Sequence, residues 1–568
     1  MRQLELLAPA RDAQIGIAAI DCGADAVYIA GPQFGARQAA GNSIEDIERL
    51  CRHAHRFGAR IFVALNTILY DDELEAAYRQ MIAVQEAGAD AIIVQDMAVV
   101  RMATEGIGNL KEDFHIPLHA STQCAIRTPE HASFLEGLGF SRLILERELS
   151  LEQIRAIRKA VTCELEFFVH GALCVCYSGQ CYLSEKIAGR SANRGACIQA
   201  CRSRYDLVDS DGKVIVKDKA LLSLKDYNLK ARLEDLAEAG ITSFKIEGRL
   251  KNESYVRNVV RDYSLALDEI VRRRPEDYER ESYGQVSKGF TPDTYKTFNR
   301  GYTELFIDGK RGRWAAMESA KSMGEEIGEV IGLNRDKSSV NLRLKRKDII
   351  LNNGDGFSFV AKDGSVAGFR GDVCSGSTIR CKSVPSLFPG ALIFRNINAA
   401  FEKEIERQAC VRSISATVDL EFMQEEGSWT VRASVLSEDG RSLTETFDAG
   451  EQKAEPCRKK GILLRKTGKV TKTLPQKDTT YQNNISNHLS KQIYREAGAS
   501  GDIAEAYELS HTPSAELMRT KYCIRYELGL CPVHQGNRNV KPLFLINNGQ
   551  RFALHFDCKA CEMTLTEA

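Results

Sequence analysis

The stretch RIFVALNTILYDDELEAAYRQMIAVQEAGADAIIVQ, residues 60–95, decides the fold. It opens with a β-branched and apolar run, passes through a polar turn into a segment with apolar residues at helical spacing, and closes on a second apolar run at 91–95. A strand, a helix and a second strand in this order form the βα repeat. Parallel strands with right-handed crossovers are the expected assembly.

The same pattern recurs through the first 250 residues. Predicted helices at 43–57 and 72–87 lie between apolar runs, and Ser43 and Glu45 mark the start of the first of these helices. The apolar runs number eight, at 4–9, 26–30, 60–66, 91–95, 116–121, 142–146, 164–170 and 242–247. Eight units predict a closed (β/α)8 TIM-like barrel, with an open doubly wound sheet as the alternative.

Polar side chains gather where the predicted strands end. They include Asp96, Arg147, His170, Glu247 and Arg249. In a barrel the carboxyl ends of the strands carry the active site, so these residues predict a polar substrate pocket. The simpler interpretation is that strand ends are polar because they meet solvent.

Composition changes after the barrel, which we place at residues 1–275 with a boundary at Arg274-Pro275. Short, glycine-rich, alternating segments predict a small antiparallel β-domain at 283–398. A β-rich and basic appended domain follows at 399–505, and a cysteine-rich tail at 506–568. The predicted fold class is therefore α/β, a TIM-like barrel followed by small β-rich domains and that tail.

Charge is balanced overall but concentrated locally. The chain has 77 Lys and Arg against 77 Asp and Glu, which argues against a wholly basic nucleic-acid coat. The tract 458–477, however, carries eight basic residues and no acidic one. Lys459, Lys460, Arg465 and Lys466 in this tract are predicted to contact the phosphates of a large polyanion. A solvated linker is the alternative.

The sequence predicts a cytoplasmic protein with no membrane partner. No stretch approaches the roughly 20 continuous apolar residues of a membrane span. Glu5, Arg11 and Asp12 interrupt the apolar core that a signal peptide would need. The 17 cysteines are therefore expected to be reduced thiols or metal ligands and not disulfides.

Five cysteines fall within 28 residues, directly after the seventh predicted strand. Cys174, Cys181, Cys197 and Cys201 have the spacing C-x6-C-x15-C-x3-C, and Cys176 is the fifth. Four thiolates can hold an iron–sulfur cluster. Structural zinc more often uses paired C-x2-C units, so the spacing favours a cluster over zinc. A thiol nucleophile paired with His170 is a third interpretation.

A second group of cysteines lies near the end of the chain. Cys523, Cys531, Cys558 and Cys561 close on a C-x2-C unit, with His534 and His555 nearby. This pattern predicts zinc or a second metal centre that stabilises a segment with little core of its own. Unrelated reduced cysteines are the alternative.

The residues also carry a family resemblance. The run 166–184, with Phe168, Gly171, Cys174, Gly179 and Cys181 in place, resembles the signature of the U32 peptidase family of collagenase-like proteases. The segments 6–10, 23–28, 34–37 and 245–249 are similar to the same family, so the resemblance spans the predicted barrel. The stretches 298–303, 521–523 and 556–559 extend it toward the end of the chain.

This resemblance implies either proteolysis or oxygen-independent hydroxylation. Some members hydroxylate a cytidine of 23S rRNA or a tRNA wobble uridine and draw on prephenate, whereas others hydroxylate ubiquinone precursors through a 4Fe–4S cluster. By analogy, Cys174, Cys181, Cys197 and Cys201 are the cluster ligands. The appended β-domains and tail make the chain look more like the long rRNA-modifying members.

Hydroxylation accounts for the residues better than proteolysis does. The sequence has no His-Glu-x-x-His helix, no nucleophile-elbow serine and no papain-like cysteine motif. We therefore predict an iron–sulfur-dependent RNA hydroxylase, with a U32-type peptidase or a small-molecule hydroxylase as alternatives. An electron-transfer partner is a further candidate.

The predicted mechanism needs an unstacked base, because stacking hides the C5 edge of a pyrimidine. Arg147 or Arg249 is expected to bind a small dicarboxylate such as prephenate, and Glu247 or Asp96 to move a proton.

Overall fold

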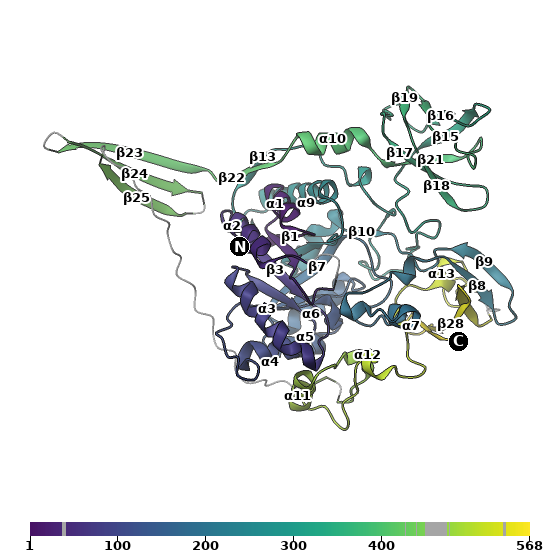
Figure 1. The fold of residues 1–568 in the computed structure, drawn as a ribbon, viewed down its shortest axis with the longest axis horizontal. Coiled ribbons are helices and arrows are strands. Elements are labelled where there is room, and N and C mark those ends of the chain that lie inside the picture. Colours follow the sequence, from purple (N-terminus) through teal and green to yellow (C-terminus); the bar gives the residue numbers. More distant parts are fainter. Residues whose placement is uncertain (37–40, 426–427, 439, 449–473, 476, 538–540) are drawn as a thin grey trace.

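The structure is a computed structural model that describes residues 1–36, 41–425, 428–438, 440–448, 474–475, 477–537 and 541–568 (Figure 1). The predicted phosphate contacts Lys459, Lys460, Arg465 and Lys466 lie outside these described residues. Among the helices described, none combines the length and the apolar character that a membrane crossing requires.

Eight parallel strands close into a barrel, as predicted. They are β1 (Arg2–Pro9), β2 (Ala26–Ala30), β3 (Arg60–Leu65), β4 (Ala91–Val94), β5 (Leu118–Ala120), β6 (Arg142–Ile144), β7 (Glu164–Gly171) and β11 (Ser243–Ile246). Each strand pairs with the next, and β11 pairs with both β7 and β1. This last pairing closes the sheet and excludes the open doubly wound alternative.

Helices surround the barrel (Figure 1). They are α1 (Ala13–Asp21), α2 (Ile44–His55), α3 (Leu74–Glu86), α4 (Ala98–Glu105), α5 (Pro129–Gly137), α6 (Leu151–Ala160), α8 (Leu233–Ala239) and α9 (Glu253–Arg273). Ser43 caps α2, because its side chain accepts a hydrogen bond from the Asp46 N–H. The helix expected from residue 72 begins as a short 3-10 turn, Asp71–Glu73, before α3.

Charged side chains fill part of the barrel interior. The buried Arg142 donates to Glu5 at 2.5 Å and to Glu166 at 3.0 Å, and Arg60 donates to Glu5 at 2.6 Å. Lys245 donates to Glu166 at 2.7 Å. Because each of these buried charges has a partner of opposite sign, the network ties β1, β3, β6, β7 and β11 together without an unpaired buried ion.

The connection from β7 to β11 is long and carries the first cysteine group. It contains α7 (Leu183–Ala188), the hairpin β8 (Tyr205–Asp209) and β9 (Val214–Lys219), and β10 (Asp226–Asn228). Strand β8 pairs with β27 (Leu543–Asn547), which continues into β28 (Gln550–Asp557), β29 (Glu562–Glu567) and β26 (Met518–Thr520). The C-terminal segment thus shares one sheet with a hairpin from the barrel region.

Two further β units follow the barrel. Strands β12 (Tyr278–Arg280) and β14 (Tyr302–Thr303) still pair with β1 and β10. A seven-stranded sheet between β15 (Glu325–Leu333) and β21 (Leu392–Ile397) has its own apolar core. After α10 (Ala399–Arg407), β22 (Val411–Ser413) pairs with β13 (Gln285–Lys288).

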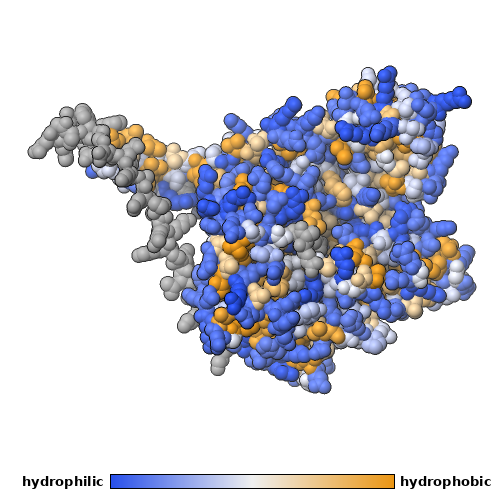
Figure 2. All heavy atoms as spheres, in the orientation of Figure 1, coloured by the Kyte–Doolittle hydropathy of each residue, from blue (hydrophilic) through white to orange (hydrophobic). Residues whose placement is uncertain are grey.

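The strands β23 (Ala416–Glu425), β24 (Ser428–Ser437) and β25 (Ser442–Asp448) form an arm that extends away from the barrel (Figure 1). Apolar side chains are visible on this arm (Figure 2), where Val418, Leu420, Leu436 and Leu443 are exposed. Later in the chain, α11 (His488–Glu496) packs against α4 of the barrel.

Candidate active site

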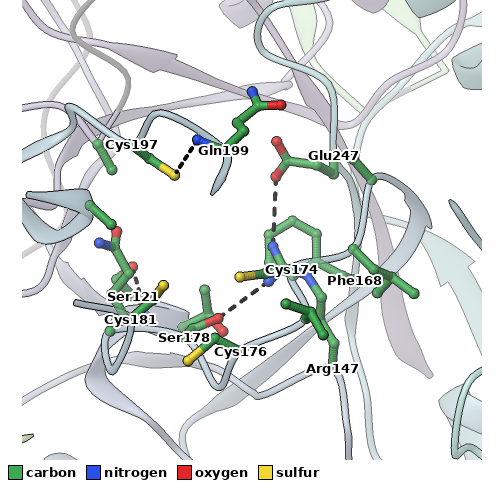
Figure 3. A pocket seen from close by; sticks show the side chains of 18 of the residues that line it. Ser121, Arg147, Phe168, Cys174, Cys176, Ser178, Cys181, Cys197, Gln199 and Glu247 are labelled. Atoms are coloured by element: carbon green, nitrogen blue, oxygen red, sulfur yellow. Dashed lines mark hydrogen bonds and ion pairs between the residues drawn. The ribbon is translucent and has the colours of Figure 1, made fainter. Parts of the chain in front are cut away.

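A cavity of about 320 Å³ opens at the carboxyl ends of the barrel strands. Its lining includes three of the predicted polar residues, Arg147, Glu247 and Arg249. It also includes all five thiols of the first group, Cys174, Cys176, Cys181, Cys197 and Cys201. Figure 3 shows four of these thiols around the opening, with Glu247 and Arg147 facing the same space. The structure thus brings the cysteines and the polar strand ends into one site.

Two glycines shape the loop that carries the first thiols. Gly171, at the end of β7, has φ +101°, and a Cβ there would lie 2.4 Å from the Glu247 carbonyl oxygen. Gly179 has φ +76°, and a Cβ there would lie 2.0 Å from the Gln123 carbonyl oxygen. Only glycine fits positions of this kind. These close approaches hold the loop against β11 and against the segment after β5.

The individual thiols have different surroundings. Cys197 accepts hydrogen bonds from the Gln199 N–H at 3.3 Å and from the Ser184 hydroxyl at 3.6 Å (Figure 3). Cys176 instead donates to the Gln180 carbonyl at 3.3 Å. The fifth thiol is therefore bonded within its own loop, and its exclusion from the ligand set stays a prediction.

Burial makes Cys174 and Cys201 hard to ionise. It raises the pKa of Cys174 well above its ordinary value, and the thiols of Cys181, Cys201 and Cys197 add to the increase while Arg147 opposes it. Burial also raises the pKa of Cys201 to about 11. A hydrogen bond from Cys176 lowers the pKa of Cys181. Cys174 and Cys201, whose ionisation is opposed by burial and by neighbouring thiols, would lose their protons more readily beside a positive charge such as a metal centre supplies.

The donor set fits a metal–sulfur cluster in number and chemistry. Among the residues that the structure describes, no three His, Cys, Asp or Glu side chains converge closely enough to hold one metal ion. The ligands of a single zinc ion all lie within about 2.3 Å of it. The thiols of a four-iron cluster are attached at different corners, so they lie farther apart. Thiols that ring a cavity suit the second arrangement better.

Arg147 contacts both halves of the site. Its guanidinium lies 3.7 Å from the Glu247 carboxylate and 3.9 Å from the centre of the Phe168 ring. It also donates to the Ser178 hydroxyl at 3.3 Å (Figure 3). Because Ser178 belongs to the cysteine loop, Arg147 links the acid at the end of β11 to that loop. Arg249 lies 5.6 Å from the ring centre of Tyr28 in the same wall.

Two residues that the sequence predicted in the pocket, Asp96 and His170, lie outside it. Asp96 accepts hydrogen bonds from the Leu69 and Ala98 N–H groups, each within 2.9 Å, and from Ser490 and Asn487. Its carboxylate therefore anchors α11, which an isolated strand-end aspartate in the sequence does not reveal. Asp96 is absent from the lining of the cavity formed by the described residues.

His170 also lies outside that lining. Its ring packs among Tyr255, Tyr263 and Tyr302, and its Nδ1 lies 3.3 Å from the Tyr263 hydroxyl. Burial lowers the pKa of His170 to about 3, so the ring is neutral at pH 7. The final residues of β7 alternate between faces of the strand, and His170 points to the helix side instead of the cavity.

Sequence reasoning did not identify a buried carboxyl pair beside this site. Glu146 and Glu148 flank Arg147 along the chain, and Glu146 accepts from the Ser178 N–H at 3.2 Å. Burial raises the pKa of Glu146 well above its ordinary value, and the nearby Glu148 adds to the increase. Two carboxyls in a buried site cannot easily both ionise, so one keeps a proton. In the sequence, the two glutamates on either side of Arg147 were the signal that could have predicted this pair.

The family match decides the identity. The peptidase family U32 matches residues 11–315, which is more than half of the chain. This protein is a member of the peptidase U32 family. The match covers the barrel from α1 onward, the cysteine loop and the turn before β14.

Several U32 relatives are similar to the chain. It is 38% identical to the 23S rRNA 5-hydroxycytidine C2501 synthase of Escherichia coli, over 99% of this chain and 93% of that protein. It is 32% identical to the tRNA hydroxylation protein P1 of Bacillus subtilis, over 60% of this chain and 80% of the relative. It is 31% identical to a collagenase of Porphyromonas gingivalis, over 55% and 76% of the two chains.

The C-terminal cysteines of this U32 protein also come together. Cys523, Cys531, Cys558 and Cys561 line a small cavity of about 20 Å³ with His534. The His534 N–H donates to Cys531 at 3.5 Å, and its Nε2 lies 3.5 Å from the Cys561 sulfur. Burial raises the pKa of Cys523. His555 points elsewhere and contacts Thr566 at 2.9 Å. Thiols and imidazole are ligands that zinc prefers, but no three such side chains among the described residues converge closely enough to hold one ion. Zinc at this group therefore stays a prediction, and metal analysis tests it.

Proposed function

We propose that this protein hydroxylates the C5 position of a pyrimidine in RNA, a 23S rRNA cytidine or a tRNA uridine, without molecular oxygen. The observation that carries the proposal is the shared cavity, in which four thiols face the Arg147–Glu247 pair at the mouth of a barrel. The relative that matches along almost the whole chain is named for rRNA cytidine hydroxylation. An RNA substrate of this kind would support the predicted cytoplasmic location.

A 4Fe–4S cluster held by Cys174, Cys181, Cys197 and Cys201 is part of this proposal. Such a cluster would supply one-electron transfer beside the substrate, with an external electron-transfer partner. The chain's own residues prepare the site: Cys197 accepts two hydrogen bonds, and Arg147 lies close enough to Cys174 to favour its thiolate. Positive charge and N–H groups around a thiolate centre stabilise its negative charge.

In this proposal, the polar residues Arg147, Glu247 and Arg249 of the cavity lining bind the substrates. Replacing C5–H by C5–OH with water as the oxygen source releases two protons and two electrons, and the external electron-transfer partner would accept the electrons by way of the cluster. The co-substrate that the site would bind beside the base is taken to be a small dicarboxylate such as prephenate. Arg249 and Arg147 are the cations assigned to its carboxylates, because guanidinium groups bind carboxylates in a bidentate manner. Glu247, 3.7 Å from Arg147, is assigned to hold or accept the proton from C5. The base enters unstacked.

Proteolysis finds less support in the site. A cysteine protease needs a thiol with a lowered pKa beside a histidine. Burial raises the pKa of Cys174, and the neutral His170 is outside the cavity lining of the described residues. The P. gingivalis collagenase relative is therefore not a reason to assign a peptidase activity here.

Nucleoside analysis tests the proposed function. A strain that lacks the gene is compared with strains that carry the native gene or the Glu247→Gln variant, and nucleosides from 23S rRNA and from tRNA are measured by mass spectrometry after anaerobic growth. We expect one hydroxylated pyrimidine to disappear in the deletion strain and to return only with the native gene. Unchanged levels of every hydroxylated pyrimidine would overturn the proposal.

A further inference from the structure

We propose that Lys251 and Arg300 form an oxyanion-binding subsite in the wall of the barrel-mouth cavity, which takes a carboxylate or phosphate group of a small ligand or nucleotide. Lys251 follows β11, Arg300 lies in the turn before β14, and both line the cavity. The subsite depends on the proposed function in one respect only, the identity of the molecule that carries the anion in the cell.

Arg300 is rigidly held on one side. Its Nη1 donates to Asp226 Oδ1 at 2.8 Å and its Nε donates to the Ala320 carbonyl at 2.6 Å. Asp226 also accepts from the Arg300 backbone N–H at 3.3 Å. The side chain is 10% exposed. Within the described part of the chain, its Nη2 has no hydrogen-bond partner, so a ligand oxygen in the cavity can complete its bonding.

Lys251 has an aromatic contact in place of an acidic partner. Its Nζ lies 3.0 Å from the ring centre of Phe298 and 5.3 Å from that of Tyr255. The described residues offer its ammonium no ion pair and no hydrogen bond. The Arg300 guanidinium lies 4.8 Å from the same Phe298 ring, so two cations share one ring. An anion bound between them would relieve their mutual repulsion.

The rest of the lining does not supply that anion. Its cations are Arg147, Arg202, Lys245, Arg249, Lys251 and Arg300, and its one carboxylate is Glu247. Glu247 lies beside Arg147, and Lys245 is paired with Glu166. Arg202 donates to the Ser223 hydroxyl and to the carbonyls of Leu224 and Leu173, which are neutral. Asp226 pairs with Arg300 at 2.8 Å, but the described residues offer Lys251 and Arg202 no acidic partner, so the Lys251 side of the cavity carries an excess of positive charge.

This assignment gives a role to the sequence motif at 298–303, which the barrel chemistry alone left unexplained. Phe298 supplies the ring and Arg300 the guanidinium, while Gly301, at φ +77°, allows the tight turn that presents them. The Asn299 carboxamide accepts from the Gly301 N–H at 3.1 Å and closes that turn. A planar guanidinium fork fits both carboxylate and phosphate oxygens.

Calorimetric binding to the full-length protein tests the subsite, with malonate and inorganic phosphate as separate probes at pH 7. We expect the native protein to bind at least one of them, and Lys251→Met to weaken that binding at least tenfold. Lys251→Arg keeps the charge and is expected to stay within threefold of the native protein. Lys159→Met, on the exposed face of α6, is the matched control and is expected to bind as the native protein does.

A pH series adds a readout that a purely structural role of Lys251 would not move. Burial lowers the pKa of Lys251 to about 8, with Asp226 and Glu247 opposing the decrease and Arg300 and Arg202 adding to it. Burial raises the pKa of the neighbouring Tyr255 phenol well above its ordinary value, so that phenol stays protonated. Malonate stays a dianion over this range, so its binding is expected to weaken between pH 7 and 9 in the native protein and to stay constant in Lys251→Arg.

Malonate binding alone would identify a carboxylate ligand, phosphate binding alone would identify a nucleotide phosphate, and binding of both would support a general oxyanion subsite. Binding of neither probe by the native protein, or native affinity in Lys251→Met, would overturn the proposal. Because binding is measured without turnover, a negative nucleoside analysis would leave a positive binding result standing.

Discussion

Glu247 is the residue on which the proposed chemistry depends most. Its carboxylate is the only one in the cavity lining of the described residues, and it lies 3.7 Å from Arg147. An acid in this position can hold a proton beside the substrate while the guanidinium binds the co-substrate. The sequence identified both residues because each lies at the end of a predicted strand.

The variant Glu247→Gln should lower the hydroxylation rate roughly 100- to 1000-fold, a typical loss when one preorganised polar group of an active site is removed. Iron content should stay at the native level, because Glu247 is not among the proposed ligands. Single-turnover assays on RNA from the deletion strain measure the rate. Glu152→Gln, exposed on α6, is the control. A native rate in Glu247→Gln would remove this residue from the chemistry.

Glu5 provides a second prediction, on stability. Burial alone would raise its pKa, but Arg142 and Arg60 outweigh burial and lower the pKa from about 4.5 to about 2. A carboxyl with a lowered pKa stabilises the fold above its unfolded pKa, and that stabilisation is lost as pH falls from about 4.5 to 2. The shift corresponds to about 3 kcal/mol at most.

Glu5→Gln should therefore destabilise the barrel at pH 7 and lose most of this acid dependence. Thermal unfolding followed between pH 7 and 2 measures the effect, with the difference between native protein and variant shrinking as pH falls. A difference that stays constant across this range would show that the Arg142–Glu5 contact contributes nothing through the charge of Glu5.

At the scale of elements, the cysteine loop is positioned by close backbone approach. Gly179→Ala would place a Cβ 2.0 Å from the Gln123 carbonyl oxygen. The loop would have to shift, and we expect most of the iron to be lost. Gly189→Ala is the control: its φ is +59°, also left-handed, but a Cβ there meets nothing within 4 Å among the described residues. Equal iron content in the two variants would contradict this account.

The strands of the barrel could be predicted because each is a short apolar run between polar turns, and eight such runs repeat one pattern. The residues that hold the cysteine loop in position could not be predicted. Glu508 accepts from Ser191 at 2.6 Å and from Asn193 at 3.1 Å, and Asn484 donates to the Gly179 carbonyl at 2.8 Å. These partners lie about 300 residues away in sequence, and periodicity carries no information on such pairing.

The same dependence on distant contacts explains why the sequence predicted Asp96 and His170 in the cavity and the structure places them outside it. A strand-end side chain faces either the cavity or the surrounding helices, and a one-residue change of register exchanges the two. The sequence places both residues at strand ends, but their partners, Ser490 for Asp96 and Tyr263 for His170, come from distant segments. Only the tertiary packing decides which way each side chain points.

At the scale of the whole molecule, positive charge is divided between two places. One is the barrel-mouth cavity, and the other is the basic tract at 458–477, most of which lies outside the described residues. The tract follows the β23–β25 arm, which extends away from the barrel (Figure 1). We interpret the cavity as the place of chemistry and the tract as a contact for RNA phosphates.

Replacing Lys459, Lys460, Arg465 and Lys466 together with Ala should weaken RNA binding and reduce the slope of log Kd against log salt concentration by up to about 3. Filter binding to 23S rRNA fragments and to tRNA at several salt concentrations measures both quantities. Malonate or phosphate binding in the cavity should be unaffected. An unchanged salt slope would show that this tract does not contact RNA.

The most direct test of the account is the iron and acid-labile sulfide content per chain after anaerobic purification. We predict about four of each for the native protein. The Cys174→Ser, Cys181→Ser double variant should lose both. Cys176→Ser should keep them, because Cys176 donates to the Gln180 carbonyl and is not a proposed ligand. Zinc alone, or no metal after anaerobic reconstitution, would contradict the account.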